Sequence, residues 1–402
     1  MVKSLFRCIL AVLAACLLFS CSGVEKESVP TRRVVLMYGA AYSNLSNNIS
    51  EDIDELCNGN VPFVSASDIL LVYAHTTKRN GDYKTPTNPV LFRAFRDIEG
   101  KLRRDTITVY PDTDVSSTAE VLNKVLTEVK DRFPARGYGL VFSSHGRGWL
   151  PVNYSETSYI LSSAPGENKD FPPTKWVGIE SADGSGIDIR DLADAIPMKL
   201  DFCIMDACLM GCVEVAYELR EKCCVFISSP TEILTNGFIY TTMASHLMGL
   251  QDPELQSVCR EYYEFYEALS GNYRSATVVM VDCTRLEVLA SVCSQLVSAH
   301  RSELDNINRS SVQRYFYSSS DLHWFYDLRD ILAKAGASDS ELTTLDRALS
   351  ICVPYYAATD YFFDLKLENV CGLSMYLPYK NKDVLNDYYK TLSWNKATGL
   401  IQ

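Results

Sequence analysis

The chain has 402 residues, of which 47% are hydrophobic, and its formal net charge at pH 7 is −12. This length and composition allow a large hydrophobic core with two lobes. An acidic surface repels phosphate backbones and attracts basic substrates, so nucleic acid is not an expected partner.

The first residues are expected to be an export signal. Lys3 and Arg7 precede an apolar run, 8–19, that is too short to span a bilayer. Residues 18–21, Leu-Phe-Ser-Cys, resemble a bacterial lipobox, in which the chain is cut before the cysteine and the cysteine carries lipid. We expect Cys21 to anchor the protein in the bacterial cell envelope or on the cell surface; the alternative is an ordinary signal peptide with a chance cysteine. The expected parts are a lipoprotein signal peptide at 1–20 and a tether at 21–31.

Three of the fourteen cysteines lie in this export segment, and the other eleven follow no regular spacing. Because eleven is odd, at least one stays unpaired unless it pairs between chains. Several, such as Cys203, Cys283 and Cys293, lie in apolar patterns in which a free cysteine behaves as a small hydrophobic residue. We therefore expect mostly reduced core thiols and a reducing or anaerobic habitat.

Strands and helices are expected to alternate up to about residue 250. The clearest helix is 118–133, with Ser116 or Ser117 as its N-cap and Pro134 just beyond its end, and a second helix is expected at 209–220. Such alternation predicts an α/β fold with a mostly parallel sheet flanked by helices. The expected strands, all short and rich in aliphatic or aromatic residues, are 33–38, 68–74, 106–110, 138–144, 202–206 and 224–229.

The remaining chain is expected to be largely helical. This pattern predicts a core at 32–250 and a mainly helical C-terminal region at 251–402 with two further strands, which could extend the sheet or form a companion sheet. The expected helices are 253–269, 285–301, 321–335 and 340–354, and the two strands are 276–282 and 372–379.

A histidine and a cysteine follow two of the buried strands. His145 comes after 138–144, and Gly146 and Gly148 leave the backbone N–H groups beyond it unobstructed for a substrate carbonyl. A lone histidine here is more often a structural residue, but Cys208 follows the strand 202–206 in the same way. Because the carboxyl ends of parallel strands meet at one edge of a sheet, the pair predicts a cysteine-dependent hydrolase.

Cys208 is expected at a strand-to-helix junction, where the positive end of the helix dipole lowers a thiol pKa. The alternative is one more buried cysteine like Cys203 or Cys212. A zinc site built from these three cysteines is disfavoured, because they contain no CxxC pair and no histidine lies nearby.

These motifs resemble the clostripain family of cysteine peptidases. The resemblance rests on Ser-His-Gly at 144–146 followed by Gly-Trp at 148–149, and on Asp-Ala-Cys-Leu-Met-Gly at 206–211, and it is strongest over 33–245. It implies a caspase-like fold, in which the core 32–250 is the peptidase. It also implies a dyad of His145 and Cys208 that works through an acyl-enzyme, with an oxyanion hole formed by the N–H groups of Gly146 and Cys208.

Asp206 is the expected specificity residue. It lies two positions before Cys208, so strand alternation aims both side chains to one side. Family members prefer arginine or lysine before the cleaved bond, and a carboxylate would pair with that cation. The alternative is an acidic N-cap for the helix at 209–220. Ser229, Thr231 and Glu232 are expected pocket walls.

The insertion 151–186 separates the histidine and cysteine strands, and irregular segments of this length are often functional. Many relatives are zymogens cut in this region, which makes Lys169 and Lys175 candidates for self-processing; an uncut surface loop is the alternative. Calcium is needed by some relatives, but the acidic residues near Asp183 and Asp188 fit no strict calcium loop. We expect no required cofactor and leave calcium open.

The predicted function is a cysteine endopeptidase that cleaves protein or peptide substrates after Arg or Lys. The chain is expected to act as a monomer. A catalytically silent surface binding module on the same fold is the alternative, and a serine hydrolase is disfavoured because the chain has no G-x-S-x-G elbow.

Overall fold

The computed structural model describes residues 31–41, 45–76, 87–152, 154, 171–175, 186–249, 251–317 and 323–402. The predicted signal peptide, Cys21 and nearly all of the tether lie outside these residues. Residues 31–402 form one compact unit. The C-terminal region expected at 251–402 therefore belongs to the same unit as the core.

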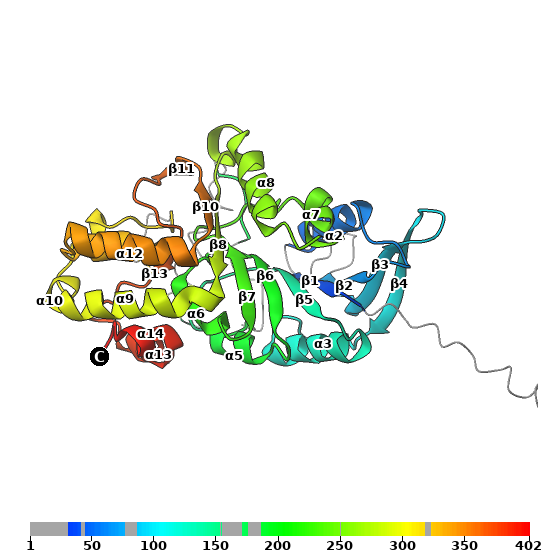
Figure 1. Ribbon diagram of the computed structural model, residues 1–402, viewed down its shortest axis with the longest axis horizontal. Coiled ribbons are helices and arrows are strands. Elements are labelled where there is room, and N and C mark those ends of the chain that lie inside the picture. Colours follow the sequence, from blue (N-terminus) through cyan, green and yellow to red (C-terminus); the bar gives the residue numbers. More distant parts are fainter. Residues whose placement is uncertain are drawn as a thin grey trace, which may run out of the picture. The chain divides into compact units, whose positions relative to one another are not determined.

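A nine-stranded sheet lies at the centre of the described residues (Figure 1), in the order β10-β8-β7-β6-β5-β1-β2-β3-β4. The neighbours from β7 to β2 are parallel, and the strands at both edges are antiparallel. The order reverses between β1 and β5, which is where open α/β sheets place their sites. The strands are β1 (Arg33–Ala41), β2 (Asp68–Thr76), β3 (Val90–Arg96), β4 (Leu102–Val109), β5 (Gly137–Ser143), β6 (Leu200–Asp206), β7 (Cys223–Ser228), β8 (Thr277–Asp282) and β10 (Tyr355–Ala358).

Helices cover both faces of this sheet (Figure 1). One face carries α3 (Ala119–Arg132), α5 (Ile189–Asp194) and α6 (Val213–Leu219), and the other carries α2 (Ser46–Asn58), α7 (Tyr240–Leu247) and α8 (Leu255–Glu267). The apolar stripe of α3 is buried as predicted. Its N-cap is Thr118, whose side chain accepts the N–H of Val121, so the prediction of Ser116 or Ser117 was wrong.

All six strands predicted in the first half are present, with ends shifted by a few residues. The sequence interpretation missed β3, because Arg93 and Arg96 interrupt its apolar pattern. The helix predicted at 209–220 begins only at Val213. The four residues before it form a turn in which Leu209 has a positive φ of 61°.

The C-terminal region adds β8 and β10 to one edge of the sheet. Helices were predicted correctly at 253–269, 285–301 and 340–354. At 321–335, where residues 321 and 322 lie outside the described residues, the helix is α11 (Leu328–Lys334). The strand predicted at 276–282 extends the sheet, and the one predicted at 372–379 is shorter and forms β13 (Ser374–Met375).

The further helices of this region are α9 (Leu286–Ala299), α10 (Arg301–Leu304), α11 (Leu328–Lys334), α12 (Asp339–Cys352), α13 (Asp383–Thr391) and α14 (Ser393–Thr398). Short 3-10 helices lie at Gly271–Tyr273, Cys283–Arg285 and Arg309–Ser311. Two pairs of short antiparallel strands are β9 (Tyr326–Asp327) with β13, and β11 (Tyr361–Phe362) with β12 (Leu365–Lys366).

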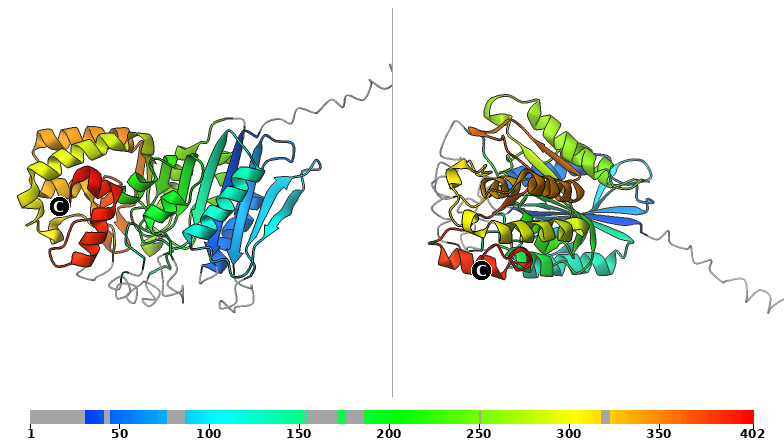
Figure 2. Two further views of the ribbon diagram at one scale, coloured as in Figure 1. Left: turned by 90° about the horizontal axis from the view of Figure 1, so that it is seen from below. Right: turned by 60° about the vertical axis from the view of Figure 1, so that its left-hand side comes forward.

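One continuous hydrophobic core joins these parts. Trp149, in the segment after β5, packs its ring against Tyr376 and Tyr389 at centroid distances of 4.6 and 5.0 Å. Helix α14 lies beside α9 in both views of Figure 2. The C-terminal region therefore buries Trp149 from the first half of the chain.

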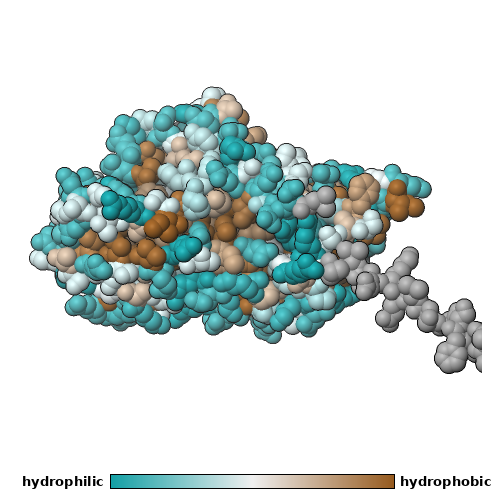
Figure 3. Space-filling view, viewed as in Figure 1, coloured by the Kyte–Doolittle hydropathy of each residue, from teal (hydrophilic) through white to brown (hydrophobic). Residues whose placement is uncertain are grey.

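The surface seen in Figure 3 is mainly hydrophilic, with hydrophobic patches among the polar residues. Two of the large exposed apolar side chains, Val288 and Ile351, lie on the helices α9 and α12, which pack against each other, whereas Ile98 lies on the β3–β4 connection. Exposed apolar residues are common on protein surfaces.

Every cysteine among the described residues is free, and nearly all are buried, as expected for core thiols. No helix within the described ranges is long and apolar enough to cross a membrane.

Candidate active site

The ends of β5 and β6 bring the predicted histidine and cysteine to one place. The two strands are parallel neighbours, with Ser143 opposite Asp206 in register. His145 and Cys208 each follow two residues later. Gly146 lies so close to the cysteine that an added Cβ would stand 2.7 Å from the Cys208 nitrogen and 2.3 Å from its carbonyl oxygen. Only glycine permits this approach, which brings the two expected oxyanion donors together.

Cys208 lies in a tight turn rather than at a helix N-terminus. Helix α6 begins five residues later, so the prediction of a helix dipole at the thiol was wrong. The turn is held to the segment after β7, because the N–H groups of Leu209 and Gly211 donate to the carbonyl oxygens of Thr231 and Ser229. Burial, with the nearby Glu232 carboxylate, raises the pKa of Cys208 well above its usual value. Burial at this position therefore favours the neutral thiol over the thiolate.

A segment of the chain itself lies across this site. Residues 171–175 run antiparallel to the segment around Leu234, which follows β7. An isolated β-bridge pairs Thr174 with Leu234. The Lys175 N–H donates to the carbonyl oxygen of Ile233 at 2.7 Å, and the Thr235 N–H donates to that of Pro173 at 3.0 Å. Pairing of this kind fixes an extended peptide in one register.

Lys175 places its carbonyl group beside His145. His145 Nδ1 lies 3.0 Å from the Lys175 carbonyl oxygen, at hydrogen-bond distance. The Ile233 N–H donates to the Cys208 sulfur at 3.2 Å, so the same residue contacts both the segment and the thiol. The Lys175 carbonyl group therefore lies beside His145, and Ile233 links the segment to Cys208.

The Lys175 side chain is fully buried among oxygens. Its Nζ lies 2.5 Å from Asp206 Oδ2, 3.1 Å from Asp52 Oδ2 and 3.2 Å from Ser143 Oγ. Burial opposes the charge on Lys175, but the two carboxylates outweigh burial and raise its pKa. Tyr240 donates its hydroxyl to the same Asp206 oxygen at 2.7 Å. These contacts describe a buried pocket for a lysine side chain, which we call the lysine pocket.

Asp52 and Gly237 complete the lysine pocket, and the sequence interpretation missed both. Burial raises the pKa of Asp52 to about 7 even beside Lys175. Asp52 lies among the buried residues of α2, next to Ile53 and between Ile49 and Leu56. An aspartate on the apolar stripe of a helix was the available signal.

Gly237 closes the far end of the lysine pocket. Its φ is +64°, and an added Cβ would stand 2.5 Å from Asp206 Oδ2 and 2.7 Å from Lys175 Nζ. Tyr266 fixes this turn by donating its hydroxyl to the Gly237 carbonyl oxygen at 2.8 Å. Any side chain at this position would enter the space that the lysine occupies.

The structure contradicts the alternative role of Asp206 as an N-cap and the expected role of Ser229 and Thr231 as pocket walls. Asp206 caps no helix, because the N-cap of α6 is Cys212. Ser229 and Thr231 do not line the lysine pocket: their hydroxyls bond to each other and to Thr277. Their carbonyl oxygens hold the turn after Cys208, so the sequence identified a supporting segment rather than a pocket wall.

The remaining predicted residues are only partly described. Lys169 and Asp183 lie outside the described residues, and Asp188 is the N-cap of α5. No group of three or more metal-binding side chains that could hold an ion is found in the described part of the chain.

Comparisons with known proteins show which family and which solved structures the chain is similar to. The model of the clostripain family matches residues 37–399. An inactive zymogen of a C11 protease from Parabacteroides distasonis is 28% identical, with a TM-score of 0.75 over 92% of this chain and 99% of that one. A secreted C11 cysteine protease from Bacteroides thetaiotaomicron, iotapain, is 25% identical, with a TM-score of 0.74 over 92% and 100% of the two chains.

The Bacteroides thetaiotaomicron protease was also solved with an irreversible peptide inhibitor, and that structure matches with 25% identity and a TM-score of 0.72 over 92% and 99% of the two chains. A search of curated proteins finds no match. The structural matches confirm the predicted caspase-like α/β fold.

Proposed function

Since the chain belongs to the clostripain family and is a cysteine peptidase, we propose that it is a latent endopeptidase that cleaves after basic residues, lysine above all. It becomes active by cutting its own chain after Lys175. The observation that carries this proposal is Lys175 itself, whose Nζ is buried against Asp206 while its carbonyl oxygen lies 3.0 Å from His145 Nδ1. A substrate lysine would enter the same pocket once the segment has left.

The proposed reaction uses the dyad and two backbone donors. His145 takes the thiol proton, and the Cys208 sulfur attacks the carbonyl carbon of the basic residue. The N–H groups of Gly146 and Cys208 stabilise the oxyanion, and loss of one such donor typically costs about 100-fold to 1000-fold in turnover. As the C–N bond breaks, His145 protonates the leaving amine. Water then hydrolyses the thioester and restores the thiol.

Latency follows from burial. While Lys175 fills the pocket, the thiol is shielded from water and its pKa stays well above the usual value, chiefly because of burial. The attacking species is the thiolate, so the intact chain reacts slowly. Cutting after Lys175 would free the segment to leave, admit water and lower the cost of ionising Cys208.

The lysine pocket fits lysine better than arginine. Three oxygens surround a single Nζ position, and Gly237 leaves no space behind that position for the longer, wider guanidinium. An arginine would have to displace Gly237 or withdraw from Asp52. We therefore expect arginyl substrates to be cut more slowly than lysyl ones.

We also propose export and anchoring. Export is supported by the similarity to a secreted protease from Bacteroides thetaiotaomicron, and the lipobox-like sequence supports lipid on Cys21. The substrates would be proteins or peptides outside the cytoplasm, cut by a monomeric enzyme without a required cofactor. An intact mass of protein from the membrane fraction tests the lipid, and activity in EDTA tests any need for calcium.

Self-processing is tested with four proteins: the unaltered chain, Cys208→Ala, Lys175→Ala and Lys169→Ala. Intact mass after incubation should show a cut after Lys175 in the unaltered chain and in Lys169→Ala. The Cys208→Ala and Lys175→Ala proteins should stay whole. A Cys208→Ala protein that is cut at the same rate would refute self-processing, and an intact Lys169→Ala protein would move the cut to that residue.

Specificity is tested on the cut enzyme with fluorogenic peptides that end in lysine, arginine or aspartate. We expect the lysyl peptide to be cut fastest and the aspartyl peptide not at all, with all activity lost after alkylation by iodoacetamide. Cut enzyme that hydrolyses none of the peptides would instead support the catalytically silent binding module.

A further inference from the structure

The segment 171–175 also contacts the protein beyond the lysine pocket. Burial changes along the segment: Thr174 and Pro172 are buried, Pro173 is exposed, and Phe171 is half-buried. If this segment lies as a substrate does, each buried residue marks a place where the enzyme contacts a substrate side chain. Phe171, four residues before Lys175, marks the position farthest from the cleaved bond.

The Phe171 ring packs against two aromatic rings. Its centroid lies 4.8 Å from that of Phe363 and 5.7 Å from that of Tyr317, and both pairs are tilted. Phe363 and Tyr317 meet edge to face at 4.8 Å, and Phe362 packs on Phe363 at 4.6 Å. Such distances and angles are those of favourable aromatic pairs. Tyr317, Phe362 and Phe363 together are called the aromatic subsite.

Phe363 has an unusual backbone conformation for a large residue. It lies in the turn between β11 and β12 with a φ of 55°, a left-handed conformation that normally favours glycine or asparagine. The ring is nevertheless 6% exposed, and the Phe363 N–H donates to Ser275 Oγ at 2.8 Å. A strained residue persists where the surrounding structure holds it, and such residues cluster at ligand sites.

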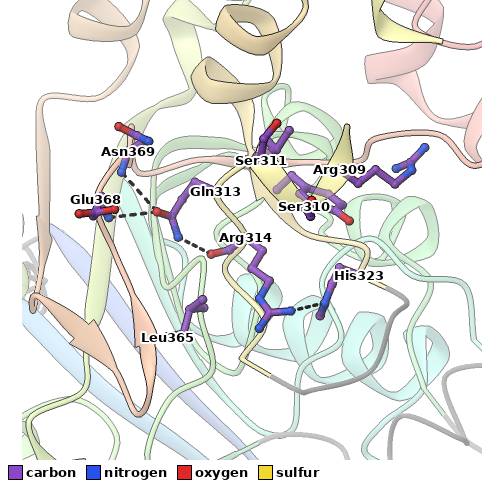
Figure 4. A pocket seen from close by; sticks show the side chains of 11 residues that line it. Arg309, Ser310, Ser311, Gln313, Arg314, His323, Leu365, Glu368 and Asn369 are labelled. Carbon is purple, nitrogen blue, oxygen red and sulfur yellow. Dashed lines mark hydrogen bonds between the residues drawn. The ribbon is translucent and has the colours of Figure 1, made fainter. Parts of the chain in front are cut away.

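Gln313 joins the two walls of the aromatic subsite. Its side-chain amide donates to the carbonyl oxygen of Lys366. It also donates to the carbonyl oxygen of Arg314 and accepts the N–H groups of Glu368 and Asn369 (Figure 4). The first wall is the β11–β12 hairpin with Phe363, and the second is the segment that continues from Gln313 to Tyr317. The two aromatic walls are thus fixed to each other before a ligand arrives, which reduces the entropic cost of binding.

We propose that the aromatic subsite selects substrates that carry an aromatic side chain four residues before the cleaved lysine. This inference rests on the proposed function, because it takes the segment 171–175 as the pattern of a substrate. The preferred substrates are then extended peptides of the form aromatic-X-X-X-Lys, in which the aromatic ring takes the place of Phe171. Selection arises from the same ring contacts that Phe171 makes.

Two peptides test the proposal on the cut enzyme: Phe-Pro-Pro-Thr-Lys and Ala-Pro-Pro-Thr-Lys, each followed by the same leaving segment. We expect kcat/KM to be about tenfold higher for the first, which corresponds to about 1.4 kcal/mol. The ratio should fall to about one in Phe363→Gly, a variant whose backbone suits the positive φ. Tyr361→Ala is the matched control, since Tyr361 lies on the same hairpin but is 45% exposed, and it should keep the preference. Equal rates on both peptides, or a preference that survives Phe363→Gly, would overturn the proposal.

A second measurement needs no activity. In the uncut Cys208→Ala protein, Phe171→Ala and Phe363→Gly should each change the thermal unfolding temperature, and the double variant should show that the two effects are not additive. Additive effects would mean that the two rings do not interact and would also overturn the subsite. Cut enzyme that cleaves neither peptide would contradict the proposed function, while the unfolding data would still decide on the subsite.

Discussion

Two carboxylates, rather than the single predicted one, face the lysine in the pocket. Asp206 and Asp52 contact the same Lys175 nitrogen at 2.5 and 3.1 Å. The pKa of Asp52 is raised to about 7, chiefly because the residue is buried. Since a carboxyl above its pKa is charged, Asp52 attracts a lysine more strongly as the pH rises through about 7.

This titration predicts a pH-dependent role for Asp52. The pKa of about 7 applies while Lys175 fills the pocket, because its ammonium group lowers the pKa of Asp52 against the effect of burial. In the unaltered cut enzyme, the KM for a lysyl peptide should therefore fall as the pH rises from about 7 upward, and in Asp52→Asn that fall should disappear. The control is Asp54→Asn, because Asp54 lies on the same helix and pairs with Arg104. Measuring KM from pH 5.5 to 8.5 checks the prediction; the same pH dependence in Asp52→Asn would contradict it.

Gly237 allows a sharper test of the lysine pocket. Gly237→Ala should reduce kcat/KM on lysyl peptides by at least about 100-fold, because its Cβ would stand 2.5 Å from Asp206 Oδ2. An alanine at positive φ also costs roughly 1–2 kcal/mol of folding stability.

Gly336→Ala separates the effect of backbone strain from the effect of filling the lysine pocket. Gly336 has a φ of +92° with no atom within 4 Å of an added Cβ, so this variant should lose stability and keep its activity. Chemical denaturation and peptide kinetics on both variants provide the comparison. Equal loss of activity in the two would mean that backbone strain, and not the filled pocket, causes the defect.

At the scale of elements, α6 connects the turn after Cys208 to the C-terminal region. Glu214 in α6 is buried, and its Oε1 accepts the Tyr376 N–H at 2.8 Å and the Tyr389 hydroxyl at 2.7 Å. Burial raises the pKa of Glu214 to about 7, although both hydrogen bonds oppose the shift. A carboxyl with a raised pKa destabilises the fold at neutral pH, since the unfolded chain releases its proton first.

The destabilisation caused by Glu214 can be measured as a change of the free energy of unfolding with pH. Below about pH 4.5 the carboxyl is protonated in both states and contributes no penalty. Between about 4.5 and 7 the penalty from Glu214 grows to as much as about 3 kcal/mol. Glu214→Gln keeps the oxygen acceptor without titrating, so its free energy of unfolding should fall less over this range than that of the unaltered protein.

Glu214→Ala provides the comparison for the hydrogen bonds. It leaves two buried donors without an acceptor, at a cost of about 1–3 kcal/mol each. Urea unfolding at several pH values compares the three proteins. Parallel pH profiles for Glu214 and Glu214→Gln would show that the carboxyl does not titrate in this range.

At the scale of the whole molecule, the proposed cut falls between strands of one sheet. Strand β5 belongs to the fragment that ends at Lys175, and its parallel partner β6 belongs to the other. The rings of Trp149 and Tyr376, from the two fragments, are buried against each other. The continuous core should therefore hold the two fragments together after cleavage.

We predict that the cut enzyme migrates as one species in size-exclusion chromatography and as two bands under denaturing conditions. Uncut Cys208→Ala serves as the reference for the elution volume. Fragments that elute separately in native buffer would contradict a shared core.

The local pattern of the sequence was enough to predict His145, Cys208 and Asp206 together. Each follows or ends a buried parallel strand, and neighbouring parallel strands bring their carboxyl ends to one edge of the sheet. The apolar periodicity of α3 was equally local. The turn after Cys208 was not predictable in this way, because it depends on the carbonyl oxygens of Thr231 and Ser229, which accept the N–H groups of Leu209 and Gly211 from a distant part of the chain.

By itself, the sequence determined the parallel core and the placement of His145, Cys208 and Asp206 at one edge of it, since these depend on strand pattern and on spacing of a few residues. Only the tertiary structure decided that Asp52 and Gly237 line the lysine pocket, that Lys175 fills it, and that Phe171 meets an aromatic wall. These residues are far apart in the chain, and only packing determines which charges are buried together and where a side chain has room.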